Sequence, residues 1–284
     1  MSTSIATLIC VYARDSPEFF REALDSVLGQ QLAPAFESRI YVGVDGPIQP
    51  ELARVLDDYA PQLFLVYQAP INRGLATTLN ELLHRLGDEE FLFRMDADDV
   101  SLPNRYQTQL DYLAAHPTID ILGTDITEFS AGKGEDRVVH FCVGPEDALA
   151  SIHKRVPVAH PTVCFRRRVF RQIDGYPVVG TNEDIALWFE CLRRELRFDN
   201  VPVSLLRFRI SPNFWQRRSL SKARSELLCY LRGIRSIHGL ATVRYLYPLG
   251  RFMMRVAPAF ISKWAYRSSL RTGSRVREAK VLDA

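Results

Sequence analysis

Apolar residues follow two alternating patterns along the first hundred positions. Four buried strands are predicted by continuous apolar runs at residues 6–12, 39–46, 63–67 and 91–95. Between these runs, apolar residues recur three and four positions apart, which predicts amphipathic helices. The first helix is expected to have Ser16 as its N-cap and Pro17 at its first position. This alternation predicts a parallel sheet with helices on both faces.

The pattern after residue 100 is more mixed. Residues 120–129 and 137–143 flank Gly132-Lys133-Gly134 and predict a β-hairpin, hence an antiparallel addition to the sheet. A further short strand is expected at residues 162–165. A helix is expected at residues 181–195, with a buried side made of Ile185, Trp188, Phe189 and Leu192.

No internal repeat or low-complexity linker divides the chain. We therefore expect an α/β fold with one main domain, residues 1–214, and a basic, amphipathic, helical C-terminal region, residues 215–284. The central sheet should be Rossmann-like and mostly parallel. Ligands of such sheets bind at the carboxyl ends of the strands, so polar residues at those ends are candidate functional residues.

The charge of the chain is divided unevenly. The 284 residues have a net charge of only +3, but from Trp215 onward there are 15 Lys and Arg against 3 Asp and Glu. Residues 1–214 carry 21 against 30. This asymmetry indicates an acidic main domain and a basic tail that meets an anionic partner. With 47% hydrophobic residues, the chain can bury a core and does not fit a disordered protein.

The five cysteines are scattered and form no CxxC pair, so neither a disulfide framework nor a zinc site is expected. Reduced thiols in a cytosolic protein fit better. The N-terminus has no basic region before its apolar run, which argues against a signal peptide. No uncharged apolar stretch reaches about 18 residues, so no spanning helix is predicted. We expect a cytoplasmic protein that is soluble or peripheral to a membrane.

Three carboxylates lie directly behind the fourth predicted strand, in "FLFRMDADD". Asp96, Asp98 and Asp99 can share a crevice at neutral pH only if a cation offsets their repulsion or their pKa values rise. Oxygen ligands in an open arrangement suit Mg²⁺ or Mn²⁺, which also accept phosphate oxygens as ligands. The alternative is a solvated acidic loop. The position at a strand end favours the metal site.

Two other segments place candidate residues near the same sheet edge. Tyr12 and Asp45 end the first two strands and could form a pocket for a base, with an aromatic face to stack on and a carboxylate to accept an N–H. Asn72, Arg73 and Gly74 precede a helix N-terminus, which favours anions. The alternatives are an ordinary Asp-Gly turn and ordinary helix capping.

A second acidic pair stands in "TNEDIALWF". Asp184 could act as a general base that takes a proton from an acceptor hydroxyl. Acidic residues are also favoured at a helix start by the macrodipole, which would explain Glu183 and Asp184 without any chemistry. His160 could line the same cavity, although a single histidine is more often structural.

Five motifs in one order resemble family 2 glycosyltransferases of the A-type (GT-A) fold, with bacterial polysaccharide and amylovoran-type enzymes the most similar. The resemblance covers roughly residues 5–210. The motifs are "ICVYARDSPEFFREALDSVLGQ", "YVGVDG", "INRGLATTLNELL", "FRMDADDVSLPNRYQTQLDYL" and "TNEDIALW".

The resemblance implies an inverting, metal-dependent transfer of a hexose-type sugar from a nucleotide-sugar, usually UDP-linked, to a hydroxyl of a glycan or lipid-linked acceptor. It implies a nucleotide-sugar half at about 1–100 and an acceptor half at about 101–214. Carried over to this sequence, the roles are as follows: Tyr12 and Asp45 contact the base, Asn72 and Arg73 line the nucleotide pocket, Asp96 holds the ribose side, Asp98 holds the metal with Asp99 beside it, Asp184 is the base, and Glu183 is its neighbour in the acceptor pocket.

Two positions depart from the family pattern. Many relatives carry a histidine after the last strand that can complete the metal shell, but "FRISPNF" has none near Ser211. The asparagine that is frequent after the first strand is replaced by Ala13.

The basic tail intersperses Arg and Lys with aromatic and aliphatic residues, and Pro248 and Pro258 are expected to break it into short helices. Positive charge beside apolar faces is typical of helices at an anionic bilayer surface, here the inner face of the cell membrane. Two alternatives are packing on the main domain and nucleic-acid binding. We expect no nucleic acid, because no recognised binding module is present.

Two other functions fit part of the pattern. A sugar nucleotidyltransferase usually has a glycine-rich loop after its first strand, and "VYARDSPEFF" has no glycine. A non-catalytic, membrane-associated nucleotide-sugar binding protein would be marked by the loss of Asp98 or Asp184, and both are present.

Overall fold

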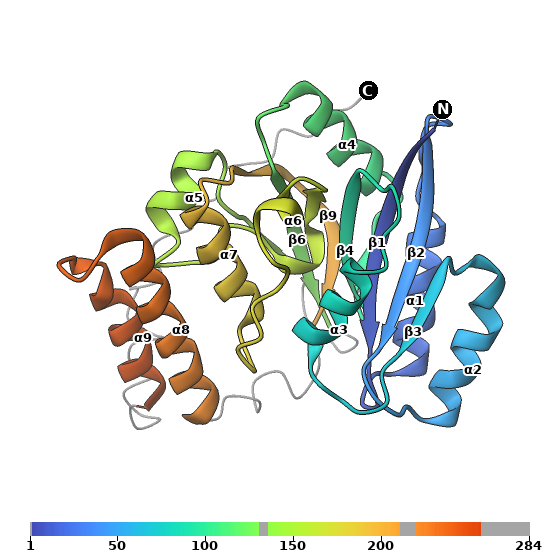
Figure 1. Ribbon diagram of the computed structural model, residues 1–284, viewed down its shortest axis with the longest axis horizontal. Coiled ribbons are helices and arrows are strands. Elements are labelled where there is room, and N and C mark those ends of the chain that lie inside the picture. Colours follow the sequence, from blue (N-terminus) through green and yellow to red (C-terminus); the bar gives the residue numbers. More distant parts are fainter. Residues whose placement is uncertain (1, 131–135, 211–219, 257–284) are drawn as a thin grey trace.

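The computed structural model describes residues 2–130, 136–210 and 220–256. Within these residues, nine strands form one sheet in the order β3-β2-β1-β4-β8-β6-β9-β5, with β7 paired to β6 (Figure 1). The strands are β1 (Thr3–Val11), β2 (Phe36–Val44), β3 (Leu65–Gln68), β4 (Phe91–Asp96), β5 (Val100–Ser101), β6 (Ile121–Phe129), β7 (Arg137–Val139), β8 (Cys164–Arg166) and β9 (Phe198–Arg209).

The α-helices are α1 (Pro17–Leu28), α2 (Pro50–Tyr59), α3 (Leu75–Leu83), α4 (Arg105–Ala115), α5 (Pro145–Ser151), α6 (Val169–Gln172), α7 (Glu183–Arg193), α8 (Leu220–His238) and α9 (Leu246–Val256). Short 3₁₀ turns occupy Ala60–Gln62, His160–Thr162 and Val243–Tyr245. The predicted start of α1 is confirmed, because Ser16 Oγ accepts a hydrogen bond from the backbone N–H of Phe19 at 3.3 Å.

The strands β3, β2, β1 and β4 run parallel, as the sequence predicts. Val11 at the end of β1 lies beside Val44 of β2, and Cys10 lies beside Asp96 of β4. The register therefore brings the ends of three strands, and the residues that follow them, to one edge of the sheet.

The other half of the sheet is mixed. Strand β8 is antiparallel to both β4 and β6, while β6 and β9 run parallel with an irregularity near Asp125. The two strands of the predicted hairpin are confirmed by the antiparallel pairing of β6 with β7. Its expected tip at residues 132–134 lies outside the described residues.

Two hydrophobic cores cover the two faces of the sheet. Alternate residues of β1 separate them: Ile5 and Ile9 pack with α1, α2 and α4, whereas Ala6 and Leu8 pack with α3, α7 and α8. Figure 1 shows this division, with α1 behind the strands and α3 in front of them. Burial of a parallel sheet on both faces explains why its strands read as nearly continuous apolar runs.

Several element boundaries differ from the expectation. The third strand begins at Leu65 rather than at residue 63, because residues 60–62 form a 3₁₀ turn, and α7 spans Glu183–Arg193 rather than 181–195. Strand β8 occupies 164–166, because Thr162 belongs to another 3₁₀ turn.

The expected break of the tail at Pro248 is wrong. The break lies near Gly239, which has a φ of 72°, and Pro248 stands in the first turn of α9, where a missing backbone N–H does no harm. Pro258 lies outside the described residues.

Helix α8 packs closely on the main domain. Tyr230 and Ile234 are buried in the same core cluster as Trp188 of α7. The proposed division of the chain at residue 214 stays a prediction, and residue 214 itself lies outside the described residues.

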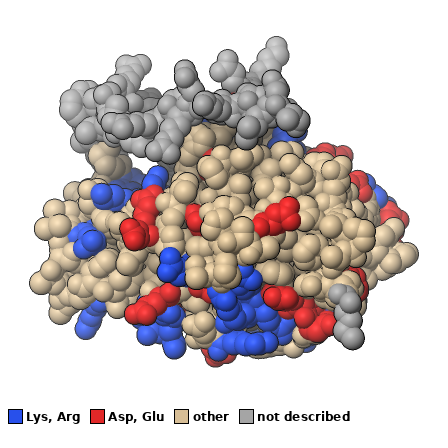
Figure 2. Space-filling view, turned by 90° about the horizontal axis from the view of Figure 1, so that it is seen from above, with Lys and Arg blue, Asp and Glu red and all other residues tan. Residues whose placement is uncertain are grey.

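The end of the sheet where β1 and β4 begin carries paired charges. Arg39 contacts Glu37, Asp88 and Glu89 there, and Arg168 contacts Asp120. Figure 2 views the molecule from this side and shows basic and acidic side chains next to one another. Among the described residues on this side, these charges offset each other. None of the helices within the described residues is long and apolar enough to cross a membrane.

Candidate functional site

A cavity of about 270 Å³ opens at the carboxyl ends of β1, β2 and β4. The register of the parallel strands places it there, as expected for an α/β sheet. Five of the predicted site residues line it, together with neighbours from the same three strand ends and the start of α3: Cys10, Val11, Tyr12, Asp15, Asp45, Asn72, Gly74, Leu75, Asp96, Ala97 and Asp98.

The three carboxylates behind β4 converge. One oxygen from each of Asp96, Asp98 and Asp99 lies within 4.8 Å of the others. Burial and the charge of Asp96 raise the pKa of Asp98 above its ordinary value. Burial raises the pKa of Asp99 well above its ordinary value too, and the charges of Asp96 and Asp98 add to the effect. Because their own repulsion disfavours ionisation, a divalent cation would stabilise the ionised cluster.

One oxygen of the cluster lacks a partner. Asp99 is fully buried, and its Oδ1 accepts a hydrogen bond from the backbone N–H of Arg209 at 2.8 Å. Its Oδ2 is buried without a hydrogen-bond partner in the described structure. Buried polar atoms usually have partners, so this oxygen fits an added ligand. Carboxylate oxygens alone are the donor set that Mg²⁺ and Mn²⁺ prefer.

Two arginines hold the cluster in place. Arg94 of β4 forms a salt bridge with Asp96, and its side chain is 3% exposed. Burial alone would lower the pKa of Arg94, but the charge and hydrogen bond of Asp96 raise it instead. Arg209, at the end of β9, donates from Nε to the backbone oxygen of Asp98 at 2.7 Å and forms a salt bridge with Glu22 of α1.

Asp45 organises the loop before α3. Its carboxylate accepts hydrogen bonds from the backbone N–H groups of Arg73, at 2.7 Å, and Gly74, at 2.9 Å. Asn72 Nδ2 donates to the backbone oxygen of Asp45 at 3.1 Å. The start of this helix is expected to favour an anion. Two N–H groups there, those of Arg73 and Gly74, already donate to the carboxylate of the protein's own Asp45.

Gly46 permits this contact. It has a φ of 87°, and a Cβ atom there would lie 2.5 Å from the backbone nitrogen of Asn72. Only glycine satisfies both the left-handed backbone and the close approach.

Tyr12 and Arg73 have different surroundings. The backbone N–H of Tyr12 donates to Asp15 Oδ2 at 2.9 Å, and Tyr12 lines the cavity half-buried. The side chain of Arg73 is half exposed and lies 3.9 Å from Glu81 of α3, so it does not line the cavity.

The acidic pair of the other motif begins α7. Burial raises the pKa of Asp184 to about 6, and the charge of Glu183 adds to this effect. The backbone N–H of Ile185 and the charge of Arg94 oppose it. The charge of Arg94 therefore lowers the pKa of Asp184 as well as the pKa values of Asp98 and Asp99. Neither Glu183 nor Asp184 belongs to the lining of the 270 Å³ cavity.

His160 fits its structural alternative. It is buried, its Nε2 lies 3.0 Å from the Tyr176 hydroxyl, and it packs edge-on against Trp188. Burial lowers the pKa of His160 well below its ordinary value, with the charge of Arg94 acting in the same direction.

Sequence reasoning missed the two arginines that support the site. Arg94 had a signal, since a single charged residue stands in an otherwise apolar strand, "FLFRM". Arg209 had none, because its contacts to Asp98 and Asp99 join positions more than a hundred residues apart. Ser211, near which the sequence lacks a histidine, lies outside the described residues.

Residues 7–174 match the profile of Glycosyl transferase family 2. An uncharacterized glycosyltransferase of Haemophilus influenzae is 31% identical over 94% of this chain and 98% of its own. UDP-Gal:alpha-D-GlcNAc-diphosphoundecaprenol beta-1,3-galactosyltransferase of Escherichia coli is 26% identical, over 94% and 96% of the two chains. The amylovoran biosynthesis glycosyltransferase AmsE of Erwinia amylovora is 29% identical, over 92% and 97%.

Solved structures show the same fold. S. aureus TarS 1-349 in complex with UDP matches with a TM-score of 0.66 and 17% identity, over 95% of this chain and 76% of TarS. The mannosyltransferase PcManGT of Pyrobaculum calidifontis, in complex with GDP-Man and Mn²⁺, matches with a TM-score of 0.62 and 16% identity, over 97% and 77%. Both likenesses support the expected arrangement of sheet and helices.

Proposed function

The chain belongs to Glycosyl transferase family 2, and from this premise we propose that it transfers a sugar, with inversion, from a UDP-sugar to a hydroxyl of a glycan or lipid-linked acceptor in polysaccharide synthesis. The observation that carries the proposal is the cluster of Asp96, Asp98 and Asp99 at the strand ends, together with a second buried acid, Asp184, whose pKa is also influenced by Arg94. The polysaccharide role is supported by AmsE, whose name assigns it to amylovoran biosynthesis.

The donor is proposed to occupy the 270 Å³ cavity. Tyr12 would stack on the base and Asp45 would face its edge, with the 72–74 loop held by the hydrogen bonds to Asp45. Asp96 would contact the ribose side. Arg73 would reach the nucleotide only by turning from Glu81, which its half-exposed side chain permits.

A divalent metal is proposed to bind at the aspartate cluster. Asp98 and Asp99 would hold Mg²⁺ or Mn²⁺, and Asp99 Oδ2 would supply the oxygen that now has no partner. When bound, the cation would offset the negative charge that develops on the departing diphosphate.

Asp184 is proposed as the general base. A carboxylate with a pKa of about 6 is largely ionised at neutral pH, yet more basic than an ordinary aspartate. It would take the proton of the acceptor hydroxyl as that oxygen forms a bond to the anomeric carbon. The bond to the diphosphate breaks on the opposite side, with an oxocarbenium-like transition state. Glu183 would stand beside it in the acceptor pocket.

A membrane surface is proposed as a further partner. Helix α9 and the turn before it expose large apolar side chains, among them Leu240, Val243, Leu246 and Met253. Arg255 at the end of α9 is exposed as well, beside its partner Glu226. Apolar and basic groups side by side suit an anionic bilayer surface. The lipid-linked acceptor named for the E. coli relative would be found at such a surface.

The test is the response to UDP and Mn²⁺. Ligand binding to the folded state raises the melting temperature, so UDP with Mn²⁺ should stabilise the wild type by several degrees. Asp98→Ala should abolish that response, and Asp57→Ala, at an exposed position of α2, should retain it. A panel of UDP-sugars then identifies the donor by metal-dependent hydrolysis. Equal responses of the wild type and Asp98→Ala would contradict the donor-site assignment, and binding without any hydrolysis or transfer would favour a non-catalytic binder.

A further inference from the structure

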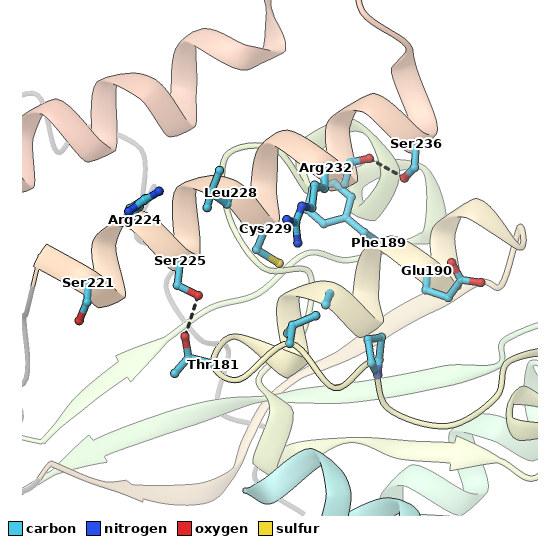
Figure 3. Close-up of a pocket in the computed structure, with 14 residues that line it drawn as sticks. Thr181, Phe189, Glu190, Ser221, Arg224, Ser225, Leu228, Cys229, Arg232 and Ser236 are labelled. Atoms are coloured by element: carbon cyan, nitrogen blue, oxygen red, sulfur yellow. Dashed lines mark hydrogen bonds between the residues drawn. The ribbon is translucent and has the colours of Figure 1, made fainter.

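A second, larger hollow lies between α7, α8 and the segment before α7 (Figure 3). It measures about 610 Å³, within the usual range for sites that bind small molecules. We call it the α7–α8 groove. Its walls come from residues 177–181, from Ala186, Phe189 and Glu190 of α7, and from one side of α8 between Ser221 and Ser236.

Packing and a polar contact join the two walls of the groove. At one end a Cβ atom on Gly233 would lie 2.2 Å from the Phe189 ring, so glycine lets α8 approach α7 closely there. Tyr230 packs edge-on against the same ring at 5.7 Å. At the other end Ser225 Oγ and Thr181 Oγ1 are joined at 2.8 Å, as Figure 3 shows.

The groove combines an apolar lining with unpaired positive charge. Its apolar residues include Val179, Leu228 and Phe189. Arg224 and Arg232 also line it, and neither has a salt bridge or hydrogen bond to another described side chain. The acidic residue of the lining, Glu190, already pairs with Arg193 and Arg194. The groove therefore offers two free cations beside an apolar surface.

The groove wall lies close to the proposed base in the sequence and in charge interactions. Thr181 in its wall is followed by Asn182, which has a φ of 65° and donates from Nδ2 to Thr181 Oγ1 at 3.2 Å. Asp184 stands two residues further on. Burial raises the pKa of Cys229 in the groove wall to about 12, and the negative charge of Asp184 adds to that shift, which places the two residues within electrostatic range.

We propose that the α7–α8 groove binds the diphosphate and the first isoprenoid units of a lipid-diphosphate-linked sugar acceptor. This rests on the proposed function, which it deepens by locating the lipid side of the acceptor. Arginine suits phosphate oxygens because its guanidinium donates several hydrogen bonds and stays charged. The apolar lining suits the isoprenoid chain, and the acceptor sugar would then extend toward Asp184.

Farnesyl diphosphate is the probe, titrated calorimetrically in EDTA so that no cation draws its diphosphate to the aspartate cluster. The wild type should bind it, and Arg224→Gln/Arg232→Gln should bind at least ten-fold more weakly. Leu228→Asp, which puts a negative charge in the apolar wall at a position 40% exposed, should weaken binding similarly. Two controls should bind as the wild type does: Arg235→Gln, on the same helix but outside the groove, and Asp98→Ala, in the donor site.

Binding that depends on the two arginines supports the groove even if no UDP-sugar is transferred, so the two proposals can fail separately. The inference is overturned if the wild type does not bind farnesyl diphosphate. It is also overturned if the double variant binds as tightly as Arg235→Gln, or if Asp98→Ala removes binding while the groove variants keep it.

Discussion

Individual residues of the candidate site have different physical roles. The cluster of Asp96, Asp98 and Asp99 places like charges within 4.8 Å, and burial together with these charges raises the pKa values of Asp98 and Asp99. Arg94 offsets part of that charge from within the fold. One oxygen of the cluster, Oδ2 of Asp99, is buried without a hydrogen-bond partner in the described structure.

Asp184 provides a prediction about activity and pH. Its pKa of about 6 means that the carboxylate accepts protons above that pH, so kcat/KM should rise with pH through about 6 and then level. Asp184→Asn should bind UDP and Mn²⁺ normally and lose about 10²- to 10⁴-fold in transfer rate. The control is Asp174→Asn, at an exposed position. Full activity of Asp184→Asn would remove it as the base.

The same residue provides a prediction about stability. A folded-state pKa raised above the ordinary 3.8 means that ionised Asp184 opposes folding at high pH, by about 3 kcal/mol, and that this penalty disappears as pH falls below about 4. Asp184→Asn should therefore melt at a higher temperature than the wild type at pH 8, and the difference should shrink toward pH 4. A difference that does not vary with pH would show that this carboxyl is not desolvated.

Gly46 allows the 72–74 loop to lie close to the end of β2. Gly46→Ala combines a strained backbone with a clash against Asn72, so the 72–74 loop should shift and UDP binding should weaken at least ten-fold. Gly144→Ala is the matched control, since Gly144 has a φ of 88° but would have nothing within 4 Å of its Cβ. Calorimetry with UDP and Mn²⁺ distinguishes them, and equal binding by both variants would refute the close-approach argument.

At the scale of elements, α8 packs on α7 most closely where Gly233 meets the Phe189 ring. Gly233→Ala would place a methyl group inside the Phe189 ring's volume and should reduce the free energy of unfolding by about 2 kcal/mol. Gly250→Ala in α9 meets nothing within 4 Å and should raise that free energy by about 0.5–1 kcal/mol through helix propensity. Urea unfolding of the two variants measures both signs. A neutral Gly233→Ala would mean that α8 is not held against α7 in solution.

At the scale of the whole molecule, acidic and basic parts are separated along the chain and apolar side chains are exposed at one end. Leu246→Glu/Met253→Glu removes two of the most exposed apolar groups of α9 and should reduce binding to anionic vesicles in flotation assays. Val203→Glu, an exposed apolar position of β9, should leave vesicle binding unchanged. Binding should also weaken as ionic strength rises. If neither salt nor the double variant alters it, the tail contacts something other than an anionic surface.

Sequence alone was sufficient for features that are local or periodic. The spacing of apolar residues predicts the parallel half of the sheet and helices α1, α2, α3 and α7, because a residue's burial repeats with the period of its own element. The acids behind the fourth strand and after the second could be placed at one edge, because parallel strands share their carboxyl ends. Boundaries shifted by two residues where a 3₁₀ turn or an early helix end depended on packing that the pattern does not encode.

Tertiary structure alone decided which distant residues meet. Arg209 reaches Asp98 and Asp99 across more than a hundred residues, and Gly233 admits the Phe189 ring of another helix. The carboxylate of Asp45 accepts hydrogen bonds from backbone N–H groups of the loop before α3. The Asp-Gly pair in the sequence does not predict these hydrogen bonds. Such contacts depend on how whole elements stack, and stacking is determined by the packing of side chains over the entire sheet. The sequence therefore determines which polar side chains stand at the strand ends. The tertiary structure determines which distant residues contact and support them.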